Sequence, residues 1–348
     1  MTRCSKCVLP ETYPGISFGE DGVCNSCLNH KDFKPLGEDE LLKRTNSYRN
    51  SGGKYDCIVA LSGGRDSTFT AYYATKVLGL RALAYTWDNG YFPEETRKNI
   101  EKAVNILGID HVFWKSDNVS RNIKHVLSAW IRKPSPGMIP LVCTGCRAGY
   151  GIGMYNTAKD NNINLIITGE GEPETSFASA MVSVRSDNPT KAFMMFGLAC
   201  EFAKNPYYLL SPRFFKDFAV EFRHRYLRPR KIGTWIRLFN FLKWNEEQIM
   251  SVISGELGWR KPVDSNSPWR ADCTIHLLKQ FLYWKTVRFT KNDEILSGMI
   301  RRKLIGRQEA MSRLEHENVI SEEFIRGFMD NMGLQYDKLM ESLEKFNS

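Results

Sequence analysis

A short apolar run that ends in a glycine-rich turn and leads directly into a helical pattern constrains this chain more than any other feature. The run covers residues 56–61, the turn begins at Ser62-Gly63-Gly64, and the helical pattern covers 66–78. A continuous apolar run of this length is typical of a buried parallel strand. Glycines let the backbone turn sharply and approach a ligand, and a helix N-terminus offers free N–H groups to an anion. The sequence therefore predicts a phosphate-binding strand–turn–helix unit.

The same alternation of strand and helix continues along the chain. Further strand-like runs and helical patterns alternate at residues 81–87, 94–107, 110–115, 118–131, 146–161 and 164–168. Repeated β–α alternation predicts an α/β fold with an open, doubly wound, mostly parallel sheet that binds ligands at the carboxyl ends of its strands. We expect this domain to cover 33–190. A mainly helical region is expected at 191–348, with 235–255 and 321–346 as its clearest helices.

Four cysteines in two CxxC pairs lie within an N-terminal module that we place at residues 1–32. They are Cys4, Cys7, Cys24 and Cys27. Because the N-terminus has no apolar signal core, we expect a cytoplasmic protein whose thiols stay reduced. Four thiolates at this spacing predict a tetrahedral zinc site, and a module this short needs a metal to fold. A rubredoxin-like iron site and a redox pair are the alternatives.

Three further cysteines form a second candidate centre. Cys143 and Cys146 make a CxxC close to the expected active face of the sheet, and Cys273 lies far along the chain. Three thiolates would leave one iron of a [4Fe-4S] cluster open for substrate or sulfide, whereas a closed structural site uses four ligands. A zinc site completed by His276, persulfide chemistry and the absence of any metal stay open as alternatives. The other two cysteines are expected to be buried, inert thiols: Cys57 and Cys200.

The formal net charge of +9 suits a phosphorylated substrate, a nucleic acid or an anionic membrane surface. Metal-bound thiolates would lower the true charge. Arginines and aromatic residues mix along 213–243. We interpret this stretch either as a membrane-surface, partner or RNA-binding patch or as a solvated helix pair with snorkelling arginines. No apolar run approaches the ~20 residues that span a bilayer, so any association with the inner membrane surface would be peripheral.

The turn between the first strand and the first helix of the α/β region resembles a known nucleotide-binding signature. Its residues, SGGRDS at 62–67, match the SGGxDS motif of PP-loop ATP pyrophosphatases, which cleave ATP between the α and β phosphates. The turn lacks the terminal Gly-Lys-Ser/Thr of a Walker loop and is not the GxGxxG dinucleotide fingerprint. The resemblance implies a site for ATP and Mg²⁺, in which Asp66 helps to hold the metal ion. It also implies that the pyrophosphate end of ATP is held by Ser62, Gly63, Gly64, Asp66 and Ser67.

Further positions extend this candidate site. Arg65 occupies the variable position of the motif, where it could contact phosphate. Asp88 ends the second predicted strand, where the PP-loop family places nucleotide contacts, and Gly169 and Glu170 end a later strand in a comparable place. We interpret Asp88 and Glu170 as ligand or Mg²⁺ contacts, or alternatively as caps of the elements that follow.

Several segments resemble the N-acetyl sugar amidotransferase family, whose members act in the biosynthesis of surface polysaccharides such as lipopolysaccharide. They lie at residues 3–12, 14–18, 22–27, 256–259 and 297–310. The resemblance implies conversion of a sugar acetamido group to an acetamidino group, in which AMP is transferred to the amide oxygen and ammonia then displaces it. It also implies a nucleotide-linked N-acetyl sugar as acceptor, a separate glutaminase and a partner subunit that channels ammonia.

The second cysteine set is not expected of a plain sugar amidotransferase. Cys143, Cys146 and Cys273 resemble the set that holds a [4Fe-4S] cluster in PP-loop tRNA thiolation enzymes, and such a cluster would suit sulfide transfer. The alternative function is therefore an ATP-dependent sulfurtransferase that acts on tRNA, a nucleobase or a small molecule. A third hypothesis, a zinc-ribbon RNA-binding or scaffold protein with a vestigial loop, is disfavoured by the intact motif at 62–67.

Overall fold

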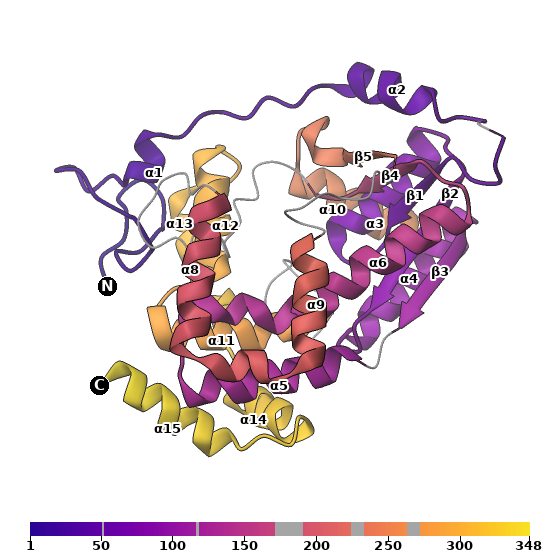
Figure 1. Ribbon diagram of the computed structural model, residues 1–348. Helices are drawn as coiled ribbons and strands as arrows, with labels where there is room; N and C mark the ends of the chain where they lie inside the picture. The colour runs from indigo at the N-terminus through magenta and orange to yellow at the C-terminus, as the bar shows by residue number, and fades with distance from the viewer. Residues whose placement is uncertain (51, 116–117, 171–190, 224–232, 263–271) are drawn as a thin grey trace.

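The computed structural model describes residues 1–50, 52–115, 118–170, 191–223, 233–262 and 272–348 (Figure 1). Within these residues the central sheet has five parallel strands in the order β3-β2-β1-β4-β5. The strands are β1 (Cys57–Ala60), β2 (Ala82–Asp88), β3 (Asp110–Lys115), β4 (Leu165–Thr168) and β5 (Thr234–Arg237). Val59 of β1 pairs with Ala84 of β2 on one side and with Ile167 of β4 on the other. The predicted parallel sheet is confirmed.

The strand order reverses between β1 and β4. From β1 the chain adds β2 and β3 on one side, and it then returns to add β4 and β5 on the other. Ligands of open α/β sheets bind outside the carboxyl ends of the strands at such a switch point. The turn that follows β1 therefore lies where a ligand site is expected.

Helices cover both faces of the sheet, because alternate side chains of each strand point to opposite sides. Val59 and Ile167 belong to the set on one face, and Ile58 and Ile166 to the set on the other, which packs against α6 (Thr144–Asp160). The helices on the first face are α3 (Arg65–Tyr72), its π-helical continuation η1 (Tyr73–Val77), α4 (Glu94–Leu107) and α10 (Glu246–Leu257). The predicted doubly wound arrangement is confirmed.

Two glycines let α6 lie close to the sheet. A Cβ atom on Gly149 would lie 2.0 Å from the Trp87 ring, and one on Gly153 would lie 2.3 Å from the Tyr85 hydroxyl oxygen. Separations this short are impossible for real side chains, so only glycine is compatible with this packing. The close packing brings the first turn of α6, which carries Cys146, to the end of β2.

Residues 235–255 do not form the single helix that the sequence predicts. In β5, Ile236 is buried while Trp235 and Arg237 on either side of it are exposed, which is the period of two that a strand requires. Pairing with β4 supplies the backbone hydrogen bonds that a helix would otherwise have made. Helix α10 begins only at Glu246, capped by the Asn245 side chain. The sheet thus takes one strand from beyond residue 190.

A helical region packs beside the sheet, and its core contains fully buried aromatic residues such as Trp130, Phe214 and Phe289. The predicted helix at 321–346 is divided at Gly333, where φ is +61°. The helical region contains α5 (Asn118–Arg132), η2 (Pro136–Cys143), α8 (Lys191–Lys204), η3 (Pro206–Leu210), α9 (Pro212–Phe222), α11 (Ile275–Val287), α12 (Lys291–Arg301), α13 (Arg307–Glu317), α14 (Glu322–Asn331) and α15 (Tyr336–Asn347). The short element η5 (Leu238–Asn240) follows β5 and packs in the core on the sheet. The mainly helical C-terminal region is confirmed. None of the helices that the structure describes is long and apolar enough to cross a bilayer.

The N-terminal cysteine module, which includes the short helix α1 (Asn25–Leu28), docks on α12 and α13. Val8 packs into the α12–α13 core and donates its backbone N–H to Ser297 Oγ at 3.2 Å. Arg3 donates to the fully buried Asp293 carboxylate at 2.6 Å. From this module the chain runs along one side of the molecule to α2 (Glu38–Asn46), which packs on the sheet domain (Figure 1).

Candidate active site

The turn after β1 packs closely against neighbouring elements. Gly63 has a φ of +76°, and a Cβ atom there would lie 2.7 Å from the Thr96 carbonyl oxygen of α4. The Gly63 carbonyl oxygen accepts a hydrogen bond from Trp259 Nε1 at 2.9 Å. Only glycine combines this left-handed backbone with such a close approach. The position of the turn is therefore fixed by α4 on one side and by the segment after α10 on the other.

Two serine side chains brace the turn from within. Ser67 Oγ lies 3.0 Å from Ser62 Oγ and accepts the Ser62 backbone N–H at 3.2 Å. Helix α3 begins at Arg65 after an extended Gly64, so its first backbone N–H groups have no acceptor within the helix. Hydroxyls, free N–H groups and the positive end of the helix dipole together make an anion site. The sequence-predicted residues of 62–67 are thus gathered at the switch point of the sheet.

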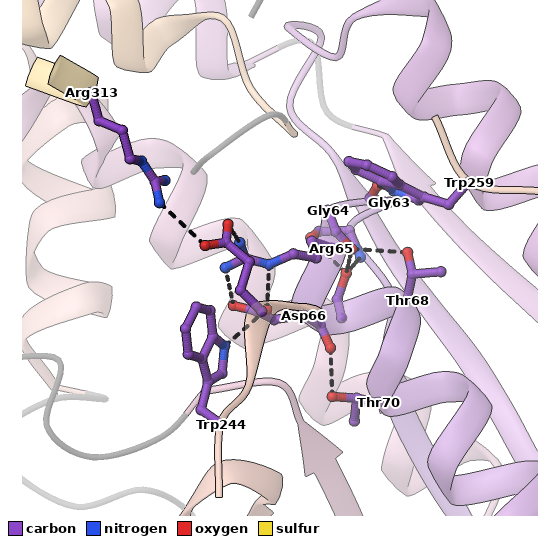
Figure 2. Close-up of polar contacts among 12 residues, drawn as sticks. Gly63, Gly64, Arg65, Asp66, Thr68, Thr70, Trp244, Trp259 and Arg313 are labelled. Carbon is purple, nitrogen blue, oxygen red and sulfur yellow. Dashed lines mark hydrogen bonds and ion pairs between the residues drawn. The ribbon is translucent and has the colours of Figure 1, made fainter. Parts of the chain in front are cut away.

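Asp66 belongs to a cluster of charged and aromatic side chains beside the turn (Figure 2). Its Oδ1 accepts from Arg65 Nε at 2.9 Å and from Trp244 Nε1 at 3.3 Å. Arg65 also donates to Glu246 at 2.6 Å, and its side chain is only 2% exposed. Glu246 also accepts a hydrogen bond from a second guanidinium, that of Arg313, at 3.2 Å. The predicted contact between Arg65 and phosphate would require its guanidinium to leave two carboxylates.

Asp88 ends β2 as predicted, and its two carboxylate oxygens contact the turn after the strand and helix α4. Its Oδ1 accepts the Gly90 backbone N–H at 2.8 Å, and its Oδ2 accepts from Arg97 at 2.8 Å. The side chain is 1% exposed. These contacts engage both carboxylate oxygens, whereas the N-cap residue of α4 is Pro93. The nucleotide or Mg²⁺ contact proposed for Asp88 stays a prediction.

Gly169 and Glu170 follow β4 and have different surroundings. A Cβ atom on Gly169 would lie 2.7 Å from the Asp66 backbone oxygen, so the end of β4 packs directly on the first turn of α3. Glu170 is exposed, pairs with Arg237 at 3.4 Å and lines an open cavity of about 550 Å³. The structure therefore brings Gly169, and not the Glu170 carboxylate, against Asp66.

The second cysteine set lies beside this turn. Cys146 is in the first turn of α6, and Cys143 immediately precedes that helix. The side-chain amide of Asn89, which follows β2, donates to Cys146 Sγ at 3.8 Å and to Cys273 Sγ at 3.1 Å. The residue before Cys273 touches the turn itself, since a Cβ atom on Gly64 would lie 3.6 Å from Asp272 Cβ. Three cysteines from distant parts of the sequence thus converge next to the candidate phosphate site.

The three cysteines are partly buried, and hydrogen-bond donors lie close to their sulfur atoms. Burial, and after it the neighbouring Cys143, raises the pKa of Cys146 to about 12. Burial likewise raises the pKa of Cys273. Lys279 Nζ lies 3.8 Å from Cys143 Sγ. Burial of this kind favours the protonated thiols of Cys146 and Cys273 until a cation or a strong donor stabilises their anions.

The N-terminal cysteines form a much tighter group. Cys4 Sγ lies 4.0 Å from Cys27 Sγ, Cys7 Sγ lies 3.7 Å from Cys24 Sγ, and all four atoms lie within 4.8 Å of one another. A tetrahedral zinc ion with Zn–S bonds of ~2.3 Å requires sulfur atoms about 3.8 Å apart. Hydrogen bonding from the Cys24 thiol lowers the pKa of Cys7 to about 4. The four residues therefore fit a metal ion of this size.

The two cysteine sets differ in the distances between their sulfur atoms. In the part of the chain that the structure describes, the N-terminal set is the group whose ligand atoms all lie within 4.8 Å of one another. The sulfur atoms of Cys143, Cys146 and Cys273 are more widely spread. His276, which was considered as a fourth ligand for zinc, has its Nδ1 only 2.5 Å from the Cys273 carbonyl oxygen. The second set is thus too open for a tetrahedral zinc ion as it stands. Of the two remaining cysteines, Cys57 is buried as predicted, whereas Cys200 is only partly buried.

Sequence reasoning missed several residues of the site. Trp244, Glu246 and Arg313 contact the Asp66 cluster from positions far along the chain, and Asn89 reaches the sulfur atoms. Trp259 lies in the segment 256–259 that resembles the amidotransferase family, and that resemblance implies no role for it. For Asn89 a signal existed, because it directly follows a strand that ends at the active face. For the other residues the sequence has no local pattern that points to the turn.

Comparisons with known proteins were made with both sequence and structure. No family model matches the chain. A stretch of 108 residues, 30% of this chain, is 32% identical to an uncharacterized protein, MJ1599, of Methanocaldococcus jannaschii. The chain spans only 38% of the length of that relative.

Among solved structures, the chain is similar to NMN synthetase from Francisella tularensis, with a TM-score of 0.36 and 13% identity over 83% of this chain and 98% of that one. It is similar to the U34-tRNA thiolase NcsA from Methanococcus maripaludis with its [4Fe-4S] cluster, with a TM-score of 0.35 and 16% identity over 91% and 89%. NH3-dependent NAD synthetase from Campylobacter jejuni gives a TM-score of 0.28 and 13% identity over 53% and 90%. Likenesses this weak establish no activity, and the resemblance to sugar amidotransferases stays a prediction.

Gly63→Ala tests the geometry of the turn. The new Cβ would meet the Thr96 carbonyl oxygen, so we expect loss of nucleotide binding and a fall in stability. Gly108→Ala is the matched control, since Gly108 also has a positive φ, +64°, but open space around its Cβ position. The free energy of unfolding of the control should fall by about 1–2 kcal/mol because of the left-handed backbone alone. That of Gly63→Ala should fall by about 1–3 kcal/mol more because of the clash. Equal losses in thermal and urea unfolding would show that the close contact is unimportant.

Proposed function

We propose that this chain is an ATP pyrophosphatase that transfers AMP to a carbonyl oxygen of its acceptor and then allows a nucleophile to replace that oxygen. The observation that carries the proposal is the turn at 62–67, which lies at the switch point of the sheet with its serines braced and Asp66 beside it. A turn of this kind suits the pyrophosphate end of ATP.

The chain's own residues would act mainly by binding and orienting. The N–H groups at the start of α3 and the hydroxyls of Ser62 and Ser67 would hold the phosphates. Asp66 would contribute a carboxylate oxygen to Mg²⁺, which would offset the charge that builds on the leaving pyrophosphate. Gly169 lets the end of β4 approach the start of α3 closely enough to enclose the site.

The reaction proposed is nitrogen transfer to an N-acetyl sugar. The amide oxygen attacks the α-phosphorus of ATP, a P–O bond to pyrophosphate breaks, and the oxygen becomes part of an AMP ester. Ammonia then adds to the activated carbon, loses a proton and expels AMP, which leaves an acetamidino group. This choice of acceptor rests on the sequence resemblance at residues 3–27 and 297–310. A separate glutaminase and an ammonia-channelling partner are proposed with it.

Sulfur transfer is the second candidate, and the second cysteine set favours it. Cys143, Cys146 and Cys273 converge beside the turn with Asn89 between two of them. Their spacing is wider than zinc requires, and three thiolates suit a [4Fe-4S] cluster that supplies an open iron for sulfide. The activation step would be the same, and the acceptor would be a tRNA, a nucleobase or a small molecule.

For the N-terminal set we propose a structural zinc ion held by Cys4, Cys7, Cys24 and Cys27. The ion would close a module in whose own core Leu9 is buried with the cysteines, while Tyr13, Ile16, Phe18 and Val23 are only partly buried against them. The module is far from the turn along α12 and α13, so its role would be to fold and dock the N-terminus (Figure 1).

Asp66→Asn tests the proposed activation step. The amide keeps an acceptor for Arg65 and Trp244 but loses the charge that a cation needs, so the fold should survive. With acceptor, ATP and Mg²⁺ present, we expect AMP and pyrophosphate formation to fall more than ~100-fold, beyond the usual cost of losing an outer-shell partner. Phosphorus NMR of the products is the measurement. Formation of ADP by the unchanged protein would contradict the proposal.

Cys143→Ser separates the two nucleophiles. In a sulfurtransferase the substitution should abolish product formation and remove iron and sulfide from anaerobically purified protein, while ATP binding persists. In an amidotransferase that uses ammonia directly, turnover with ammonium salts should stay within about twofold, a small effect on the free-energy scale. Cys57→Ser, at a buried cysteine outside both sets, is the control.

Cys4→Ser tests the structural metal. Zinc content measured by elemental analysis should fall by one ion per chain, and the melting temperature should drop because metal binding supplies much of the folding free energy of such modules. Chelation of the unchanged protein should have the same effect. If zinc is lost and the melting temperature does not change, the module is not stabilised by the ion.

A further inference from the structure

The buried Arg65 guanidinium lies between two carboxylates and an indole ring. It donates to Asp66 at 2.9 Å and to Glu246 at 2.6 Å, and its centre lies 4.8 Å from the Trp244 ring centroid (Figure 2). Such a cation is strongly desolvated and must be compensated by fixed anions. Because one positive charge is shared between two carboxylates, neither of them is fully neutralised by it.

The two oxygens of Asp66 have unequal contacts. Oδ1 accepts from Arg65 Nε at 2.9 Å and from Trp244 Nε1 at 3.3 Å. Oδ2 has a long contact of 3.4 Å to Arg65 NH2. Two donors on one oxygen fix the rotation of the carboxylate and leave the other oxygen as the better ligand for a cation. The Asp66 side chain is 26% exposed, so the carboxylate is not sealed off from solvent.

Glu246 holds Arg65 in this arrangement. Its Oε1 accepts from Arg65 and its Oε2 from Arg313 at 3.2 Å, so each of its oxygens is committed to one guanidinium. Arg313 is itself anchored on α13 by Glu317 at 2.8 Å. Without the Glu246 charge, the full charge of Arg65 would be directed to Asp66, and it would compete with a cation there.

From this geometry we infer that Glu246, acting through Arg65, is a positioning residue that keeps the Asp66 carboxylate oriented and available to the magnesium of bound Mg·ATP. The inference rests on the proposed function, since it assigns Asp66 to Mg·ATP. Outer-shell partners of metal ligands act in this way, by fixing the ligand and tuning its charge.

The test is binding of ATP to the full chain with and without Mg²⁺, measured by calorimetry on the unchanged protein and on Glu246→Gln. We expect the variant to bind Mg·ATP about 10- to 100-fold more weakly. Binding of ATP in EDTA should change by less than about twofold, which is within the scatter of a lost exposed contact. Raising the Mg²⁺ concentration should recover part of the affinity in the variant.

Asp56→Asn is the matched control. Asp56 has a buried carboxylate that accepts a hydrogen bond from the Arg81 guanidinium at 2.6 Å. It lies at the amino end of β1, whereas the turn at 62–67 follows the carboxyl end of that strand. The Asp56→Asn substitution should lower the melting temperature as Glu246→Gln does, without changing the Mg²⁺ dependence of ATP binding. If Glu246→Gln does not fold, Trp244→Phe serves in its place, because it removes one donor to Asp66 Oδ1 and keeps an aromatic ring beside Arg65.

The outcomes separate the two claims. A variant that is less stable but binds Mg·ATP and metal-free ATP as the unchanged protein does overturns the positioning role and leaves the proposed function standing. An unchanged protein that binds no ATP under any condition overturns the proposed function, and the inference with it. If the affinities for Mg·ATP and for metal-free ATP fall to the same extent, the inference is also overturned, because the whole binding site is then impaired.

Discussion

The close contact between Gly63 and α4 is the constraint on which the rest of the site depends. With no side chain at this position, the backbone approaches the Thr96 carbonyl, and Trp259 holds the Gly63 carbonyl from the other side. The turn is therefore a fixed structure before any ligand arrives, and the start of α3 is fixed with it. Donors that are already oriented need little reorganisation when an anion binds.

From this turn, a series of contacts runs through the molecule to its N-terminus. Arg65 contacts Glu246, Glu246 contacts Arg313 on α13, and Arg307 at the start of α13 donates to the carbonyl oxygens of Cys4 and Cys7 at 3.2 and 3.1 Å. The cysteine module and the turn are thus connected through one helix.

The parts of the structure that the sequence predicted are those encoded by neighbouring residues. The strand at 57–60, the turn and the CxxC pairs are local patterns, and the structure confirms the sheet and the N-terminal cysteine group. The strand β5 was missed, because Thr234–Arg237 is a strand only through its pairing with β4. Glu246 and Arg313 were missed for the same reason, since nothing near them in sequence points to Asp66.

In the proposed reaction, the identity of the nucleophile depends on the state of Cys143, Cys146 and Cys273. Sulfide and ammonia both attack an activated carbon and expel AMP, so the turn itself cannot distinguish them. A free thiol at Cys146, whose pKa burial raises to about 12, is protonated at neutral pH and is a poor nucleophile. Persulfide chemistry at this residue would need a compensating cation, and the wide spacing of the set does not suit zinc. Under the proposed function, a cluster that bound all three thiolates would stabilise them as anions, and it would supply sulfide in place of ammonia as the nucleophile.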